Sequence, residues 1–299
     1  MRGKRRFFAK GVWGITLGIC LLGFMMPPAL LAGSWRLKHS IERGPGKYPL
    51  HYPLGLYFDA ARSILYVADS GNNRLISYDS KWKPLKIFDA AGQLQGPIGM
   101  AREKNGNLWV VERSINSLTF INLKQRKIER HHLTLKGEMV LVDKLLLWRD
   151  KLVVLDRESG KILVLGKGLT IEKVLSPDDK GFKGFFDVKA KGDTLWGMET
   201  LTGRLFGFDA AGNLKGTFTP KKHLPQPVSF ERDADGNVYL LDRYLKKLLV
   251  FNSDGSLRYE MLKQGFNRGQ LSYPWLLLMV GNSLLVLDEG NGRIDVWNR

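Results

Sequence analysis

Hydrophobic residues in this chain gather in short runs, each of which ends in an acidic residue. Six runs share this pattern: Leu65–Asp69, Leu108–Glu112, Leu152–Asp156, Leu195–Glu199, Val238–Asp242 and Leu285–Asp288. Apolar runs of four or five residues separated by turn residues are typical of β-strands. The 33 glycines recur along the chain and favour many tight turns, so the pattern predicts a β-rich fold.

The six acidic residues repeat at an almost constant spacing of 43, 44, 43, 43 and 46 residues. A basic residue follows five positions after the acid in every unit except the second, where Ser117 stands: Arg74, Lys161, Arg204, Lys247 and Arg293. Four units open with a proline 14 to 16 residues before the acid: Pro53, Pro97, Pro227 and Pro274. A period near 43 residues is that of a four-stranded propeller blade.

The repeats therefore predict an all-β fold over residues 35–299, a six-bladed β-propeller with four-stranded antiparallel blades. The chain ends just after the third strand of the last blade, at Arg293 to Trp297, so this blade needs an outer strand from elsewhere. Residues 35–41 have a strand-like alternation and lead through a glycine-containing loop to Tyr48-Pro49, as residues 257–274 do. We expect residues 35–41 to complete the sixth blade.

Two stretches closely resemble the NHL repeat: LYVADSGNNRLISYD at 65–79 and LLVLDEGNGRIDVWN at 284–298. The fifth unit keeps the spacing of the repeat but lacks its Asn-Arg signature. The third unit, around Asp156, diverges most from the repeat. The resemblance covers residues 35–299 and implies a propeller with a ligand- or partner-binding role. Related six-bladed propellers include calcium-dependent lactonases of the gluconolactonase type and metal-dependent lyases.

The N-terminus is predicted to be a targeting segment. Residues 1–10 carry five positive charges, and residues 11–33 form an apolar stretch interrupted by Pro27 and Pro28. The stretch suits either a signal peptide, cleaved after Ser34, or a retained transmembrane anchor. In both cases the positive flank stays in the cytoplasm and the propeller is extracytoplasmic, in the periplasm or on the cell-surface side, either secreted or anchored to the membrane.

Composition narrows the chemistry further. The single cysteine, Cys20, lies in the apolar stretch, which excludes disulfides and thiolate metal sites from the exported part. Five of the 46 basic residues belong to the N-terminal flank, so 41 remain against 29 acidic residues. This excess suits either a solvated basic surface or an anionic partner. Nucleic acid is not expected, because the protein is exported and has no reader motif.

The repeated acids and bases are interpreted as structural, because a scaffold needs them in every blade and a catalytic group is needed once. A carboxylate at this turn can accept backbone N–H bonds or pair with the base across it. The positions assigned to this scaffold are Asp69, Arg74, Glu112, Asp156, Lys161, Glu199, Arg204, Asp242, Lys247, Asp288 and Arg293. A ring of cation ligands around the axis is the alternative.

Departures from the repeat point to a binding face. Arg113, Arg157 and Arg243 directly follow the acid in three blades, and Lys221 and Lys222 lie in a loop between blades that opens on the same face. This basic face is predicted to bind another protein or an anionic envelope component, such as a polysaccharide or lipid headgroups. A merely solvated face is the alternative.

Catalysis has little support in the sequence. The expected inner strands carry only four carboxylates: Asp59, Asp143, Asp187 and Glu231. A zinc site would need several histidines at equivalent positions of different blades. The five histidines of this chain lie at different positions of the repeat: His39, His51, His131, His132 and His223. We therefore expect a monomeric, non-catalytic binding platform without a metal or cofactor. The alternative is a metal-dependent hydrolase, lactonase or lyase of the six-bladed propeller type.

Overall fold

The computed structural model describes residues 35–299. The predicted positive flank (1–10), the signal or anchor segment (11–33) and the cleavage position after Ser34 lie outside these residues and stay predictions. Helix within residues 35–299 is limited to four short 3-10 turns at Pro45–Lys47, Ser70–Asn72, Arg113–Ile115 and Lys167–Leu169. No helix in this part of the chain is long and apolar enough to cross a membrane.

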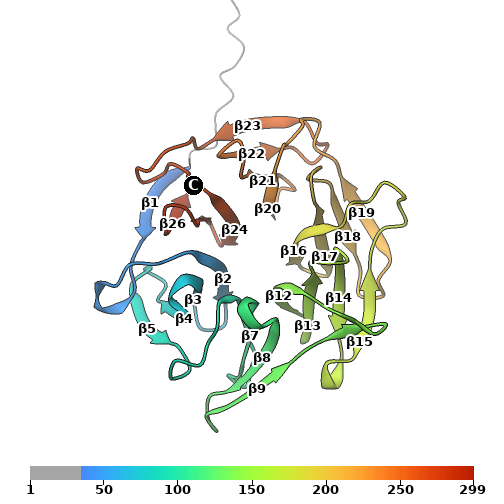
Figure 1. Cartoon of the computed structure of the whole chain (residues 1–299). Coiled ribbons are helices and arrows are strands. Elements are labelled where there is room, and N and C mark those ends of the chain that lie inside the picture. The colour runs from blue at the N-terminus through green and yellow to red at the C-terminus, as the bar shows by residue number, and fades with distance from the viewer. Residues whose placement is uncertain (1–34) are drawn as a thin grey trace, which may run out of the picture. The chain divides into compact units, whose positions relative to one another are not determined.

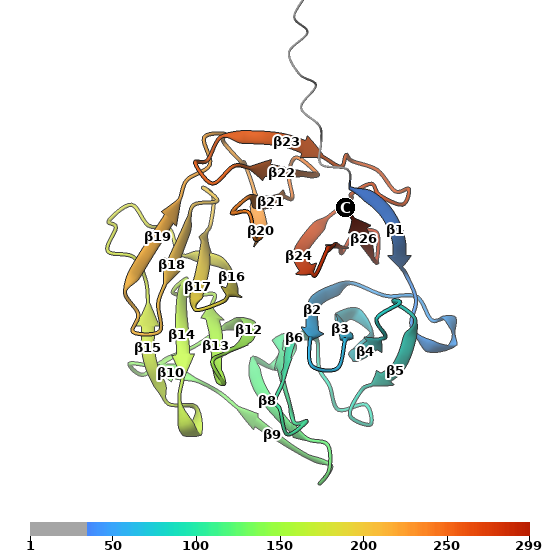
Figure 2. The ribbon, with the colours of Figure 1, turned by 180° about the vertical axis from the view of Figure 1, so that it is seen from behind.

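Six four-stranded antiparallel sheets form a ring around a central axis (Figures 1 and 2), which confirms the predicted propeller. The strands of blades 1 to 3, from the axis outward, are β2 (Pro53–Asp59), β3 (Ile64–Asp69), β4 (Arg74–Tyr78), β5 (Pro84–Phe88); β6 (Pro97–Arg102), β7 (Leu108–Glu112), β8 (Ser117–Asn122), β9 (Lys127–His131); and β12 (Val142–Trp148), β13 (Lys151–Asp156), β14 (Lys161–Leu165), β15 (Ile171–Leu175). Those of blades 4 to 6 are β16 (Phe185–Lys191), β17 (Thr194–Glu199), β18 (Leu205–Phe208), β19 (Leu214–Phe218); β20 (Pro227–Arg232), β21 (Val238–Asp242), β22 (Lys247–Phe251), β23 (Leu257–Met261); and β24 (Pro274–Val280), β25 (Ser283–Asp288), β26 (Arg293–Asn298), β1 (Arg36–Ile41).

The hydrophobic core lies between neighbouring blades. The second and third strands of a blade are covered on both sides, so they consist of almost continuous apolar residues, as in β21 and β22. Tyr239 and Val250 of blade 5, for example, pack in one cluster with Leu277 and Val286 of blade 6. Each such side chain contributes about 1.5–3 kcal/mol through burial, so a single blade is not expected to be stable without its neighbours.

The ring is closed by the N-terminal strand, as the sequence predicts. Strand β1 pairs antiparallel with β26, from Arg36 opposite Asn298 to Ile41 opposite Ile294. The sixth blade therefore combines the two ends of the described chain, and β26 is not left as an unpaired edge.

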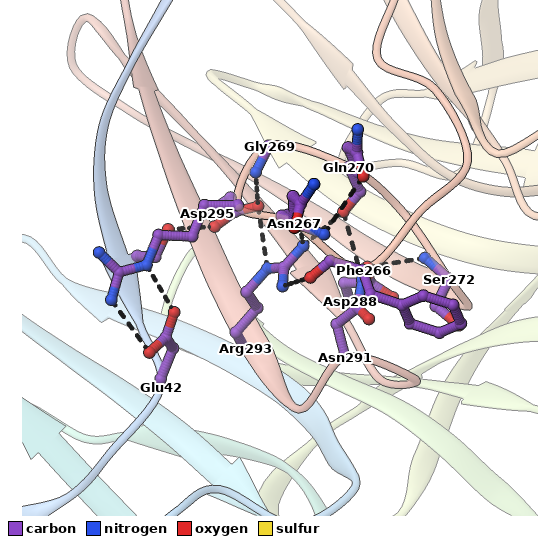
Figure 3. A network of polar contacts seen from close by, with 12 residues as sticks. Glu42, Phe266, Asn267, Gly269, Gln270, Ser272, Asp288, Asn291, Arg293 and Asp295 are labelled. Carbon is purple, nitrogen blue, oxygen red and sulfur yellow. Dashed lines mark hydrogen bonds and ion pairs between the residues drawn. The ribbon is translucent and has the colours of Figure 1, made fainter.

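A buried polar network reinforces the closure (Figure 3). The guanidinium of Arg293 donates to the backbone carbonyls of Phe266 (2.9 Å) and Asn267 (2.6 Å) and contacts Asp295 at 3.2 Å. Asp295 in turn accepts the Ser40 hydroxyl of β1 (2.5 Å) and the backbone N–H of Gly269 (2.9 Å). The network thus fastens β1 and the loop between β23 and β24 to β26.

One element is absent from the sequence-based prediction. The connection from blade 2 to blade 3 forms a small hairpin, β10 (Thr134–Leu135) with β11 (Glu138–Met139). Each strand has only two residues and no apolar run, so its local pattern does not differ from that of a loop.

Removal of residues 35–45 is expected to lower the melting temperature by at least ~10 °C, because it exposes the edge of β26 and removes Ser40, one of the partners of Asp295. Thermal unfolding followed by circular dichroism measures the change. Lys38→Ala, at an exposed position of β1, is the control and should melt like the wild type. An unchanged melting curve for the deletion would contradict the closure.

Candidate functional site

A buried carboxylate anchors one loop in every blade. The acid that ends the second strand accepts the backbone N–H of the loop leading into the same blade, with N···O distances of 2.6 to 2.9 Å. The pairs are His51 with Asp69, Gln95 with Glu112, Leu141 with Asp156, Lys183 with Glu199, Gln226 with Asp242, and Ser272 with Asp288. These acids are at most 4% exposed, so the bonds are shielded from water. They fix the loops on one face, which we call the connecting face.

The repeated base contacts this acid in two blades. Arg74 donates its Nε to Asp69 (2.7 Å), and Arg204 binds Glu199 through two nitrogens (2.7 and 2.8 Å). Lys247 instead pairs with Glu260, Arg293 pairs with Asp295, and Lys161 makes no ion pair with the described residues.

In blade 2, where Ser117 replaces the base, the cation comes from another strand. Arg130 of β9 contacts Glu112 at 3.0 Å. The acid is therefore the uniform part of the scaffold, and the cation that accompanies it differs from blade to blade.

The connecting face holds a pocket of about 250 Å³ at the axis. Its lining comes from blades 2, 3, 4 and 6 and includes Arg113, Asp143, Arg157, Lys183, Phe186 and Trp275. We call it the axial pocket. Arg113 lies in the turn after β7, and Arg157 lies in the turn after β13. Each arginine directly follows the buried carboxylate that ends its strand, Glu112 or Asp156.

A β-bulge supplies three of the lining residues. All six inner strands have a register shift around their second residue. A bulge leaves one residue unpaired and redirects its side chain. In blades 3, 4 and 6 this residue is Asp143, Phe186 or Trp275, and each of them lines the axial pocket. Phe186 and Trp275 were not among the residues predicted from the sequence, although their common position in the repeat is a signal that could have identified them.

The cations of the axial pocket differ in how far they are neutralised. Arg113 contacts Asp143 at 2.6 Å, but its Nε is buried without a hydrogen-bond partner. Arg157 is exposed, and no carboxylate of the described residues lies within 4.0 Å of it. Lys183 is also exposed, and the second acid of the lining is Glu158. The lining thus carries three basic and two acidic side chains.

Arg243 reaches the same region from blade 5. Its guanidinium lies 5.2 Å from the ring centre of Trp275 and pairs with Glu289 at 2.9 Å. The three arginines singled out in the sequence thus gather around the axis. Lys221 and Lys222 lie elsewhere, where they pair with Asp254 and Glu260, and neither lines the axial pocket.

The residues near the axis do not fit a divalent metal. Every inner-strand carboxylate has a basic group within 4.0 Å: Asp59 with Arg62, Asp143 with Arg113, and Asp187 and Glu231 with Lys189. Within residues 35–299, no three or more His, Cys, Asp or Glu side chains form a group that could hold a metal ion. The histidines do not contribute to the axial pocket.

Comparison with known proteins supports the fold. No family model and no curated protein matches the chain, so the resemblance to NHL repeats is not confirmed. Solved structures with a similar fold include virginiamycin B lyase from Staphylococcus aureus, with 17% identity over 85% of this chain and 84% of that one and a TM-score of 0.62. A streptogramin B lyase has 10% identity over 88% and 97% of the two chains, with a TM-score of 0.65. A gluconolactonase from Xanthomonas campestris has 12% identity over 88% and 94%, with a TM-score of 0.64. The chain is a six-bladed β-propeller whose structural neighbours include lyases and a lactonase.

Glu199→Gln tests the carboxylate that anchors the loop. Burial raises the pKa of Glu199, but bonds from Arg204, Thr202 and the Lys183 N–H outweigh it and hold the pKa below its usual 4.5. The variant should lose about 2 kcal/mol of unfolding free energy at pH 7. Because the folded-state pKa is the lower one, this difference should be complete above about pH 4.5 and shrink as the pH falls through it.

Urea unfolding of both proteins at several pH values measures this difference. Glu129→Gln, on the outer strand β9, is the control and should change stability little, since Glu129 is partly exposed. Equal stability of Glu199→Gln and the wild type at pH 7 would contradict the anchoring role.

Proposed function

We propose that this propeller binds a small anionic molecule in the axial pocket. The observation that carries the proposal is the pair of arginines at its rim. Arg157 has no carboxylate partner among the described residues, and the buried Nε of Arg113 has no acceptor. A buried donor without an acceptor costs about 1–3 kcal/mol, so a ligand oxygen at this position would recover that energy.

The size and lining of the axial pocket support a small molecule as the ligand. A volume of about 250 Å³ lies just below the usual range of ligand pockets, about 300–1,000 Å³, and therefore favours a ligand of few atoms. Apolar surface from Phe186 and Trp275 lies beside the cations, a mixture typical of sites that orient a ligand with few polar groups. A larger anionic partner on the connecting face and the extracytoplasmic location stay predictions.

An enzyme of the lyase or lactonase type is the second candidate. The solved neighbours are enzymes of these types and support this alternative better than the non-catalytic platform favoured by the sequence. Cations fixed at the site of reaction can stabilise negative charge that develops on a substrate oxygen, and Arg113 and Arg157 offer such groups. Because the axial carboxylates are paired with bases, no step in this pocket is assigned to a metal.

Arg157→Glu should weaken binding of a small anion at least ~10-fold, because it replaces the available cation with a repelling charge. Isothermal titration calorimetry of the full chain with benzoate, gluconate and inorganic phosphate, at low and high salt, measures the affinity. Lys180→Glu is the matched control, since Lys180 is exposed and does not line the axial pocket. Equal affinities of the wild type, Arg157→Glu and Lys180→Glu would contradict the proposal, as would the absence of binding of any probe by the wild type.

The enzyme candidate predicts turnover of a lactone, an ester or a streptogramin B antibiotic by the purified chain. Product formation from δ-gluconolactone, p-nitrophenyl acetate and the antibiotic is measured by chromatography, with and without EDTA. Turnover that survives EDTA and is lost in Arg157→Glu, but not in Lys180→Glu, supports catalysis in the axial pocket. Turnover of none of these substrates would reject the enzyme candidate for the lactone, ester and streptogramin classes.

A further inference from the structure

A second polar cluster lies on the inner strands of blades 4, 5 and 6. Asp187 and Lys189 belong to β16, and Ser229 and Glu231 belong to β20. Asp187 is 1% exposed and Glu231 is 8% exposed, so the two carboxylates are almost removed from water. Two buried carboxylates on neighbouring strands are costly unless hydrogen bonds or a cation compensate their charge.

The Lys189 ammonium supplies that cation. Its Nζ donates to the backbone carbonyl of Leu277 on β24 (2.6 Å) and lies 3.7 Å from Glu231 Oε1 and 3.9 Å from Asp187 Oδ2. Oxygen atoms from three consecutive blades thus surround one positive charge. Such a set of carboxylate and carbonyl oxygens is of the kind that binds hard metal cations.

Further hydrogen bonds orient the oxygens. Asp187 Oδ2 accepts the Ser229 hydroxyl (2.6 Å), and Ser229 Oγ accepts the backbone N–H of Leu277 (3.0 Å). Glu231 Oε1 accepts the backbone N–H of Met279 (3.1 Å). Burial raises the pKa of Glu231 despite the nearby Lys189 ammonium, which fits two carboxylates that share one cation. Hydrogen bonds therefore hold the cluster in a fixed geometry that joins β16, β20 and β24.

We propose that Lys189 is a built-in cation that takes the place of an axial metal ion in this propeller. Its ammonium offsets one of the two negative charges of Asp187 and Glu231 and links three inner strands, so it fills the place of a divalent ion here. Without the ammonium, the two carboxylates and the Leu277 carbonyl surround a space that holds no positive charge. These oxygens then form a site for calcium.

The test is thermal unfolding of the full chain in EDTA and in calcium chloride. The wild type should melt at the same temperature in both. Lys189→Ala should melt lower in EDTA, and calcium should raise its melting temperature by at least ~5 °C. Lys144→Ala is the matched control: it removes another axial lysine, but Asp143 keeps Arg113 as its partner, so calcium should have no effect.

Two further measurements apply if Lys189→Ala does not fold. Lys189→Met with Glu231→Gln removes one positive and one negative charge, so this double variant should fold and should not respond to calcium. Calorimetric titration of the wild type with calcium should show no binding that depends on Glu231. Stoichiometric calcium binding by the wild type that Glu231→Gln abolishes would overturn the proposal, as would a Lys189→Ala protein as stable as the wild type and indifferent to calcium.

Discussion

The structure depends on one repeated interaction, the bond between a buried carboxylate and the backbone N–H of the loop that leads into its own blade. The carboxylate ends the second strand, and the loop arrives from the neighbouring blade, so each bond fixes the connection between two sheets. A charged acceptor shielded from water makes such a bond stronger than a neutral one. Six of these anchors hold the connecting face in place, and the axial pocket forms between the loops and turns that they fix.

Two other groups of polar side chains hold together parts of the ring that apolar packing alone does not join. At the junction of the chain ends, Arg293 and Asp295 fasten β1 and a neighbouring loop to the last blade. At the axis, Lys189 lies among oxygens from three blades. Both sites contain a buried charge whose partners come from segments distant in sequence. Arrangements of the ring that separate these groups from their partners are therefore disfavoured, because they leave a buried charge unpaired.

The sequence predicts the ring well, because each blade repeats the same backbone requirements. The period near 43 residues, the turn residues and the strand at 35–41 are all local or repeated signals, and the structure confirms the fold they indicate. The contacts of the repeated bases could not be predicted, because a long side chain can reach several acids. Lys247, for example, pairs with Glu260 and not with the repeated acid of its blade, Asp242. The role of Trp275 depends on a bulge that reorients one residue, and that of Lys189 depends on atoms from three blades. The position of Trp275 becomes recognisable only when equivalent positions of the repeats are compared, and the cluster around Lys189 has no signal in any one segment.

The proposed anion site lies at the axis of the connecting face, where a bound ligand can be located by crystallography. A crystal of the full chain soaked in 4-bromobenzoate is the decisive experiment, because the anomalous scattering of bromine locates the ligand without assumptions about its contacts. We expect a bromine peak in the axial pocket, beside Phe186 or Trp275, with the carboxylate directed at Arg157 and the Nε of Arg113. Ordered ligand on other surfaces while the axial pocket holds none would contradict it.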